Sequence, residues 1–341
     1  MTDNSVIAAV FAKTDLGRTR DHNEDAFLIA DLTAGRSSLH SSVARYTVGP
    51  RGLLILVADG MGGAAAGELA SAMAADLIFG HLIGTWTKEK EDEVTPDRFT
   101  LRLREAVELA NLQIHTYARE HPEVRGMGTT ATVAGILGDH IYLAQVGDSR
   151  GYLVRHGKAV QITKDQSLTQ RLVDAGELTE EEAEASTRRN IILQALGPDP
   201  RIRVELTHEQ ISRGDTLVLC SDGLSGQVKR EEIADHVARL TDLDKLGAEL
   251  ISLANSRGGP DNITVVAARF DGPGLPDAAV DPAYSVIETE EQLGRTPPET
   301  PAPVAPAPAP PHPRTGSPAG MAMLVIGTIL VLLAAFLAFG G

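Results

Sequence analysis

The chain has 341 residues, of which 43% are hydrophobic and 4% aromatic, and a formal net charge of −15. This length and apolar content allow one large domain or two small ones, with a core filled mainly by aliphatic side chains. The negative charge argues against non-specific binding to nucleic acid, which needs a basic surface. The single cysteine, Cys220, lies in an apolar run, which argues against disulfides and cysteine-rich zinc sites and fits a core thiol in a reducing compartment.

The hydrophobic pattern predicts two groups of strands, each accompanied by amphipathic helices. Residues 1–15 lack the basic start and long apolar stretch of a signal peptide, and residues 31–52 are polar enough to predict a loop or an irregular hairpin. Short apolar runs predict strands at residues 6–13, 53–58, 129–137, 141–146, 151–154, 159–163, 202–206, 216–220 and 263–270. Apolar residues spaced three and four apart predict helices at residues 64–82, 103–117, 230–240 and 243–256.

Acidic residues recur at the ends of these predicted strands. Asp59-Gly60 follows an apolar run, where a carboxylate is costly unless a positive charge meets it, and glycine lets a backbone carbonyl point at the same spot. Taken alone, this dipeptide is typical of a plain turn. Further acids stand at other strand ends: Glu24, Asp25, Asp148, Asp222 and Asp261. Because carboxylate and carbonyl oxygens are the ligands that Mg²⁺ and Mn²⁺ prefer, the recurrence predicts one shared metal cluster.

Six short motifs, in this order along the chain, resemble those of the metal-dependent protein phosphatases of the PP2C (PPM) type. They are RxxNED at 20–25, VADGMGG at 57–63, GTT at 128–130, GDSR at 147–150, SDGL at 221–224 and DNIT at 261–264. The resemblance is strongest to the bacterial serine/threonine phosphatases and covers roughly residues 5–270. It implies an α+β fold for residues 1–271, the PP2C-like α/β/β/α four-layer sandwich with two central antiparallel sheets flanked by helices.

The resemblance also implies how the metal cluster is built. Asp59 would bridge two ions, Mn²⁺ or Mg²⁺, and the carbonyl of Gly60 would bind one of them. Asp222 and Asp261 would complete the shell of one ion. Glu24 would serve the other.

Other residues would support this centre. Asp25 would lie behind the direct ligands, and Asp148 would bind a third, weaker ion of the kind seen in bacterial members. Arg20 would hold the substrate phosphate, since its planar fork suits a phosphoryl group, whereas Arg18 fits a surface ion pair. Eukaryotic relatives have a histidine that resembles a general acid where this chain has Met61, which cannot donate a proton. The leaving-group acid is therefore unassigned, with a metal-bound water as the candidate.

Residues 165–197 correspond to a flap over the site that affects substrate choice in the family. The pattern predicts one short helix near residues 168–173 and the start of another at Thr179, which opens a capping box. The family's usual DHSL reads DQSL here, at residues 165–168, so a substrate preference cannot be carried over from the resemblance.

The composition changes beyond residue 271. Thirteen of the chain's 19 prolines lie in residues 272–320, which predicts a disordered, extended linker, with a ligand for a proline-binding module as the alternative. Residues 321–339 carry no charge and, at about 1.5 Å per residue, would cross a bilayer core of about 30 Å. A buried core helix is the other interpretation, but no fold follows the linker to bury it. With Arg314 on the near side, the sequence predicts a single-pass tail anchor in the cell membrane and a cytoplasmic phosphatase domain.

The predicted activity is metal-dependent hydrolysis of phosphoserine and phosphothreonine on proteins by a metal-activated water, opposing a serine/threonine kinase in bacterial signalling. The expected partners are phosphorylated proteins, including the kinase and its substrates, and the membrane, but not nucleic acid. One alternative is a catalytically weak, membrane-tethered regulator that binds phosphoproteins, against which the intact acidic set argues. A metal-dependent nuclease is the alternative among enzymes, and it would need basic surface that this chain lacks.

Overall fold

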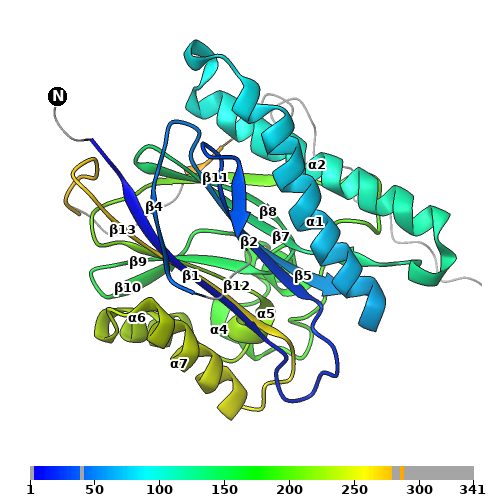
Figure 1. Ribbon diagram of the computed structural model, residues 1–341. Helices are drawn as coiled ribbons and strands as arrows, with labels where there is room; N and C mark the ends of the chain where they lie inside the picture. The colour runs from blue at the N-terminus through cyan, green and yellow to red at the C-terminus, as the bar shows by residue number, and fades with distance from the viewer. Residues whose placement is uncertain (1–3, 39–41, 279–284, 288–341) are drawn as a thin grey trace, which may run out of the picture. The chain divides into compact units, whose positions relative to one another are not determined.

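Two β-sheets lie at the centre of the structure, a computed structural model that describes residues 4–38, 42–278 and 285–287 (Figure 1). The six-stranded sheet has the order β10 (Lys158–Gln161), β9 (Arg150–Arg155), β12 (Thr216–Cys220), β13 (Ile263–Asp271), β1 (Ile7–Asp15) and β4 (Ala44–Thr47). The eight-stranded sheet has the order β14 (Ser285–Val286), β11 (Glu205–Gln210), β8 (His140–Val146), β7 (Ala131–Leu137), β5 (Leu53–Met61), β2 (Asp25–Asp31) and β3 (Arg36–Ser38), with β6 (Gly128–Thr129) paired to β5. All of these pairs are antiparallel, as predicted.

Helices cover the outer face of each sheet. Figure 1 shows α1 (Ala64–Gly84) and α2 (Pro96–Glu120) side by side, and they pack on the eight-stranded sheet through β5, β2, β7 and β8. The six-stranded sheet is covered by α6 (Arg230–Arg239) and α7 (Leu243–Ser256). Apolar residues on the inner side of these helices are buried against the strands, among them Ala70, Ile78, Leu103, Val107, Ile233, Leu246 and Leu250.

A third layer of apolar side chains fills the space between the two sheets. Alternate residues of each strand point into it, as expected for strands that are covered on both faces. The buried members include Val10, Ile29, Ile55, Val57, Leu143, Leu219, Val266 and Phe270. Most are aliphatic, in agreement with the low aromatic content. The predicted fold, two antiparallel sheets flanked by helices, is therefore confirmed.

Two segments differ from the pattern expected from the sequence. Residues 31–52 contribute the turn and second strand of a hairpin, since β3 pairs with β2, but β4 pairs with β1 in the other sheet. The strand expected at 202–206 instead runs from 205 to 210 and pairs with β8, and of its residues only Leu206 and Thr207 are buried. In addition, β14 pairs with β11, so strand structure occurs beyond residue 271, and the first compact unit runs from Met1 to Glu288.

Three short helices lie in the parts of the chain that surround the predicted site. They are α3 (Leu168–Asp174), α4 (Glu180–Ala185) and α5 (Asp222–Ser225). The predicted capping box at the start of α4 is present, since Thr179 and Glu182 each accept the other's backbone N–H. Ser167 caps α3 in the same way through the N–H of Gln170.

One described segment, Ala65–Lys88, is long and apolar enough to cross a membrane. It contains α1, whose contacts with β2, β5 and α2 identify it as a core helix of the domain. The predicted membrane-spanning residues 321–339 and most of the predicted linker lie outside the described residues.

Candidate active site

Asp59 lies at the end of the central strand β5, and its backbone is held on both sides. Its N–H donates to the hydroxyl of Thr130 at 2.9 Å, and its carbonyl accepts from the Thr130 N–H at 2.8 Å and the Thr129 hydroxyl at 3.0 Å. Burial raises the pKa of the Asp59 carboxyl well above its usual range, and repulsion from Asp25 and Asp222 raises it further. The strand therefore delivers a fixed carboxyl group into an acidic surrounding.

Asp25 begins β2 directly opposite Asp59, because the register of β2 and β5 pairs the two residues. Its carboxylate accepts hydrogen bonds from the hydroxyls of Ser221 and Thr264, each at 2.7 Å. Burial raises the pKa of Asp25 to about 7, although these two hydrogen bonds act in the opposite direction. Asp25 thus ties the eight-stranded sheet to the ends of β12 and β13 in the other sheet.

Asp222 is the first residue of α5, immediately after β12. Burial raises the pKa of its carboxyl, and so does repulsion from Asp261, whereas a hydrogen bond with the Asp59 carboxyl lowers it. Burial and acidic neighbours disfavour the charge of both Asp59 and Asp222, so a divalent cation bound by both carboxylates would offset that cost.

Glu24 and Gly60 lie next to each other at the same end of the sheet. The carbonyl of Glu24 accepts the Gly60 N–H at 3.1 Å, and the Glu24 N–H donates to the side chain of Asn262 at 2.8 Å. A Cβ at Gly67, in α1, would lie 2.8 Å from the Glu24 carboxyl carbon. Glycine at 67 therefore lets the helix approach this carboxyl. Burial raises the pKa of Glu24, and the positive charge of Arg20 opposes that effect.

Asp148 lies in the turn between β8 and β9 and is only 6% exposed. Its Oδ1 atom is buried without a hydrogen-bond partner, which is costly for a polar atom. Burial, together with repulsion from Asp222, raises its pKa to about 8. A hard cation would satisfy the free oxygen, so Asp148 also fits a metal ion.

These acidic groups share one end of the two sheets, as the sequence predicts, and the oxygen donors suit Mn²⁺ or Mg²⁺. Within the described ranges, no three histidine, cysteine, aspartate or glutamate side chains converge closely enough to form a ready-made coordination shell. The mutual repulsion that raises their pKa values shows that the carboxylates are nevertheless near neighbours.

Arg20 forms an ion pair with Asp261, with 2.8 Å between guanidinium and carboxylate. Its side chain is 48% exposed and lines a cleft that extends away from the acidic residues. Arg18 is also exposed but does not line this cleft. The structure therefore places Arg20, and not Arg18, beside the acidic residues. Met61 ends β5 next to Gly60.

A cleft of about 1280 Å³ extends from the acidic residues between the flap (residues 165–197) and α6. Arg20, Asp148, Asp222 and Asp261 line one end of it, and residues of α4, β10 and α6 line the remainder. The cleft is large enough for a phosphorylated side chain and part of the segment that carries it.

Arg189 is a residue of this cleft to which the sequence analysis assigns no role. Its guanidinium lies against Gly226, where a Cβ would be 3.4 Å from one of its nitrogens, and its charge lowers the pKa of Asp222. Among the described residues, Arg189 forms no ion pair. The pattern could not reveal it, because its position depends on how the flap folds back over α5.

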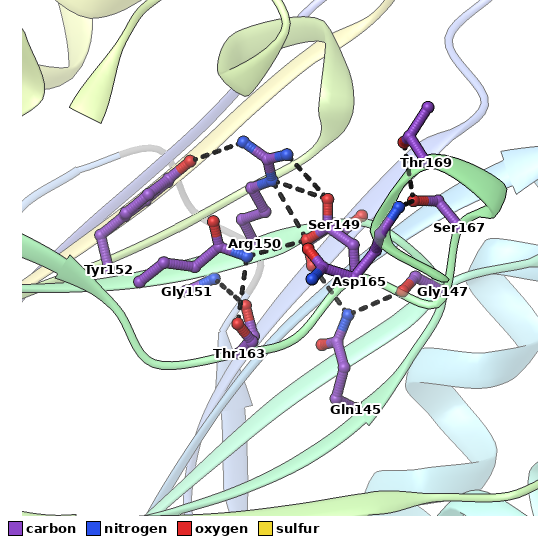
Figure 2. Close-up of polar contacts among 12 residues, drawn as sticks. Gln145, Gly147, Ser149, Arg150, Gly151, Tyr152, Thr163, Asp165, Ser167 and Thr169 are labelled. Carbon is purple, nitrogen blue, oxygen red and sulfur yellow. Dashed lines mark hydrogen bonds and ion pairs between the residues drawn. The ribbon is translucent and has the colours of Figure 1, made fainter. Parts of the chain in front are cut away.

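Figure 2 shows a polar network, formed in part by residues that line the cleft, which fixes the start of the flap. Arg150 donates to both carboxylate oxygens of Asp165, at 2.8–3.1 Å, and to the Tyr152 hydroxyl at 3.3 Å. Asp165 is 7% exposed at its side chain and also accepts from Gln161 at 2.8 Å. Arg150, the arginine of the GDSR motif, therefore has a structural role. It binds Asp165, the first residue of the flap, and it follows Asp148 by only two positions in the chain.

Comparison with known proteins identifies the family. The sequence model of protein phosphatase 2C matches residues 42–261. The serine/threonine phosphatase Stp of Listeria welshimeri is 36% identical over 254 residues, which cover 74% of this chain and 92% of that protein. The chain belongs to the protein phosphatase 2C family. The serine/threonine protein phosphatase PstP of Mycobacterium tuberculosis is 34% identical over 308 residues, 84% of this chain and 54% of PstP.

Solved structures agree with this membership of the protein phosphatase 2C family. The catalytic domain of PstP in complex with two manganese ions superposes with a TM-score of 0.62 at 34% identity, covering 78% of this chain and 100% of that one. The predicted enzyme class, a protein serine/threonine phosphatase of the bacterial type, is confirmed. The predicted cofactor, two Mn²⁺ or Mg²⁺ ions, is confirmed as well. The roles of the individual site residues remain predictions.

We expect Arg189→Ala to raise the KM of this phosphatase for a phosphothreonine peptide about tenfold while kcat changes less. The reason is the loss of one charge-assisted contact with the substrate, which is worth about 1.5–3 kcal/mol. Steady-state kinetics on the peptide measure both constants. Arg188→Ala is the matched control, since Arg188 is exposed and does not line the cleft. Equal effects of the two substitutions would rule out the specific role.

The acidic residues predict an unusual dependence of stability on pH. The pKa values of Asp25 and Asp148, about 7 and 8, exceed the usual value of about 3.9 in an unfolded chain, so the folded state binds protons more tightly. In chelator, the melting temperature should therefore fall as pH rises from about 5 to 8.5. Saturating Mn²⁺ displaces the protons and should raise the melting temperature more at pH 8.5 than at pH 5. Thermal melts across this range test the prediction, and an equal Mn²⁺ effect at both pH values would contradict it.

Proposed function

We propose that this phosphatase removes phosphate from phosphoserine and phosphothreonine in proteins and thereby opposes a serine/threonine kinase. The observation that carries the proposal is that Arg20, Asp148, Asp222 and Asp261 line one cleft, which is large enough for a protein segment, and that the buried carboxyl group of Asp59 is a near neighbour of Asp222 and Asp148. The relatives named above, which are serine/threonine phosphatases, support the same substrate class.

The proposal assigns the metal ligands as follows. Asp59, Asp222, Asp261, Glu24 and the carbonyl of Gly60 would hold the two ions. When bound, the cations would supply water activation and positive charge opposite the phosphoryl oxygens. The protein's part is to hold these oxygens in place, and the backbone hydrogen bonds that fix Asp59 and Glu24 support this role.

Arg20 binds the phosphoryl group of the substrate in this proposal. In the structure its partner is Asp261, itself an assigned metal ligand. With Asp261 engaged as a metal ligand, the Arg20 guanidinium would be free to form two parallel hydrogen bonds with phosphate oxygens. Asp25 would not touch the ions. Its hydrogen bonds to Ser221 and Thr264 support a role in positioning β2 against the neighbouring ligands.

Asp222→Ala should lower phosphate release from a phosphothreonine peptide by on the order of 100-fold or more, since even outer partners of metal ligands are worth 10–100-fold. Phosphate release is measured with Mn²⁺ and with chelator. Asp235→Ala is the control, because Asp235 is an exposed residue of α6 that lines the same cleft away from the acidic residues. No turnover by folded, Mn²⁺-loaded wild-type protein would favour a phosphoprotein-binding regulator instead.

We further propose that residues 321–339 cross the cell membrane once and tether a cytoplasmic phosphatase domain through a proline-rich linker. The support is the uncharged sequence of those residues and the proline content of residues 272–320. In cell fractionation, the full chain should sediment with membranes and resist alkaline extraction, whereas a chain that ends at residue 320 should be found in the soluble fraction. A membrane-bound truncated chain would contradict the proposal.

A further inference from the structure

The turn that carries Asp148 is held by hydrogen bonds to its neighbours and not by packing alone. Gly147 has a φ of 104°, and a Cβ there would lie 2.6 Å from the Thr130 side chain, so this backbone needs glycine. On one side, Gln145 donates to the carbonyls of Gly147 at 3.2 Å and Ser149 at 2.8 Å (Figure 2). These bonds fix the two carbonyls that flank Asp148.

Gln166, the second residue of the flap, holds the same turn from the other side. Its side-chain Oε1 accepts the N–H of Gly147 at 3.1 Å, and its own N–H donates to the Gly147 carbonyl at 2.8 Å. Both polar groups of Gly147 are therefore bound by one flap residue. This is the position at which the DHSL pattern of the family is replaced by DQSL.

The same glutamine is bound to two other parts of the chain. Its Nε2 donates to the carbonyl of Arg203 at 3.0 Å, and its carbonyl accepts the N–H of Leu193 near the end of the flap. The orientation of the amide is fixed by this pattern, since only Oε1 can accept from Gly147 and only Nε2 can donate to Arg203. Gln166 joins both ends of the flap to the turn of Asp148.

We propose that Gln166 is a positioning residue for Asp148, and that it holds the unpartnered Oδ1 of that residue toward the cleft, ready to bind a third divalent cation. The inference rests on the proposed metal centre. The side chain of Gln166 bonds to Gly147 and Arg203 and contacts neither Asp59 nor Asp222 through these hydrogen bonds, so a displaced turn would mainly move Asp148. Loss of the Gln166 side-chain bonds should therefore weaken one ion selectively.

The test measures Mn²⁺ binding to the full chain in detergent. Isothermal titration calorimetry and the electron paramagnetic resonance signal of free Mn²⁺ are the two readouts. Gln166→Met keeps the length of the side chain and removes both polar atoms. Gln170→Met is the matched control, because Gln170 also lies in the flap and lines the cleft but bonds to Asp174 instead of Gly147. Thermal melts of each variant show whether the fold is kept.

We expect three Mn²⁺ ions in the wild type, with the weakest bound about tenfold more weakly in Gln166→Met, as for other residues that orient metal ligands. The two tighter ions should change less than twofold, and Gln170→Met should match the wild type at all three. The Mn²⁺ concentration for half-maximal phosphatase activity should shift only if the third ion contributes to turnover. The binding measurements, and not the activity, therefore test the inference.

Two results would overturn the inference. Either the wild type binds only two ions, or Gln166→Met weakens all ions together with a lower melting temperature, which would indicate a general structural role. In both cases, Mn²⁺-dependent phosphatase activity of the wild type would leave the proposed function intact. Absence of any Mn²⁺ binding by folded wild-type protein would instead remove the proposed function along with this inference.

Discussion

The repulsion among carboxyl groups buried at one end of the two sheets is the constraint on which the rest of the site depends. Each of Asp25, Asp59, Asp148 and Asp222 has a raised pKa because burial disfavours its charge and at least one of its neighbours is also acidic. Such a cluster folds only if something offsets the repulsion. Protons, the guanidinium of Arg20 and divalent cations can all do this, and of these the cations and Arg20 also have a part in the proposed chemistry.

The residues around these carboxyl groups stabilise them in different ways. Serine and threonine hydroxyls donate to Asp25, backbone groups fix Asp59, and Arg20 pairs with Asp261, so each acid meets a different kind of partner. None of these partners removes the mutual repulsion within the centre. Because the remaining charge is negative and the free donors are oxygens, the centre is suited to small hard cations and poorly suited to an anionic substrate without them.

Strand pairing converts acids that are far apart in the sequence into one site. The register of β2 and β5 places Asp25 opposite Asp59, and a shift of one residue would turn every side chain of β2 to the other face. The apolar layers on both sides of the sheet make such a shift costly. The same layers that stabilise the fold therefore also fix the relative positions of these acidic residues.

Much of this could be predicted from the sequence, and what could not has physical reasons. The strands before Asp59 and Asp222 are apolar runs that end in an acid. This pattern by itself predicts a buried strand with a candidate metal ligand at its end. Arg189 and Gln166 lack a comparable signal, because their partners, Gly226 and Gly147, are brought near by the folding of the flap. The edge strands β3 and β4 are short and polar, so nothing in their composition shows that they belong to different sheets.

The flap combines a fixed base with a loosely attached outer part, and this division bears on how substrate choice can vary. Its ends are bound next to the metal centre, through Asp165 to Arg150 and through Leu196 to Thr129, which itself holds the Asp59 carbonyl. Farther out, α4 meets α6 through the exposed ion pair of Glu180 and Arg230, at 3.4 Å, and pairs of this kind contribute about 0–1 kcal/mol. Residues on α4 can therefore change the walls of the cleft at little cost to stability, while changes at the base would also displace the residues that hold the metal ligands.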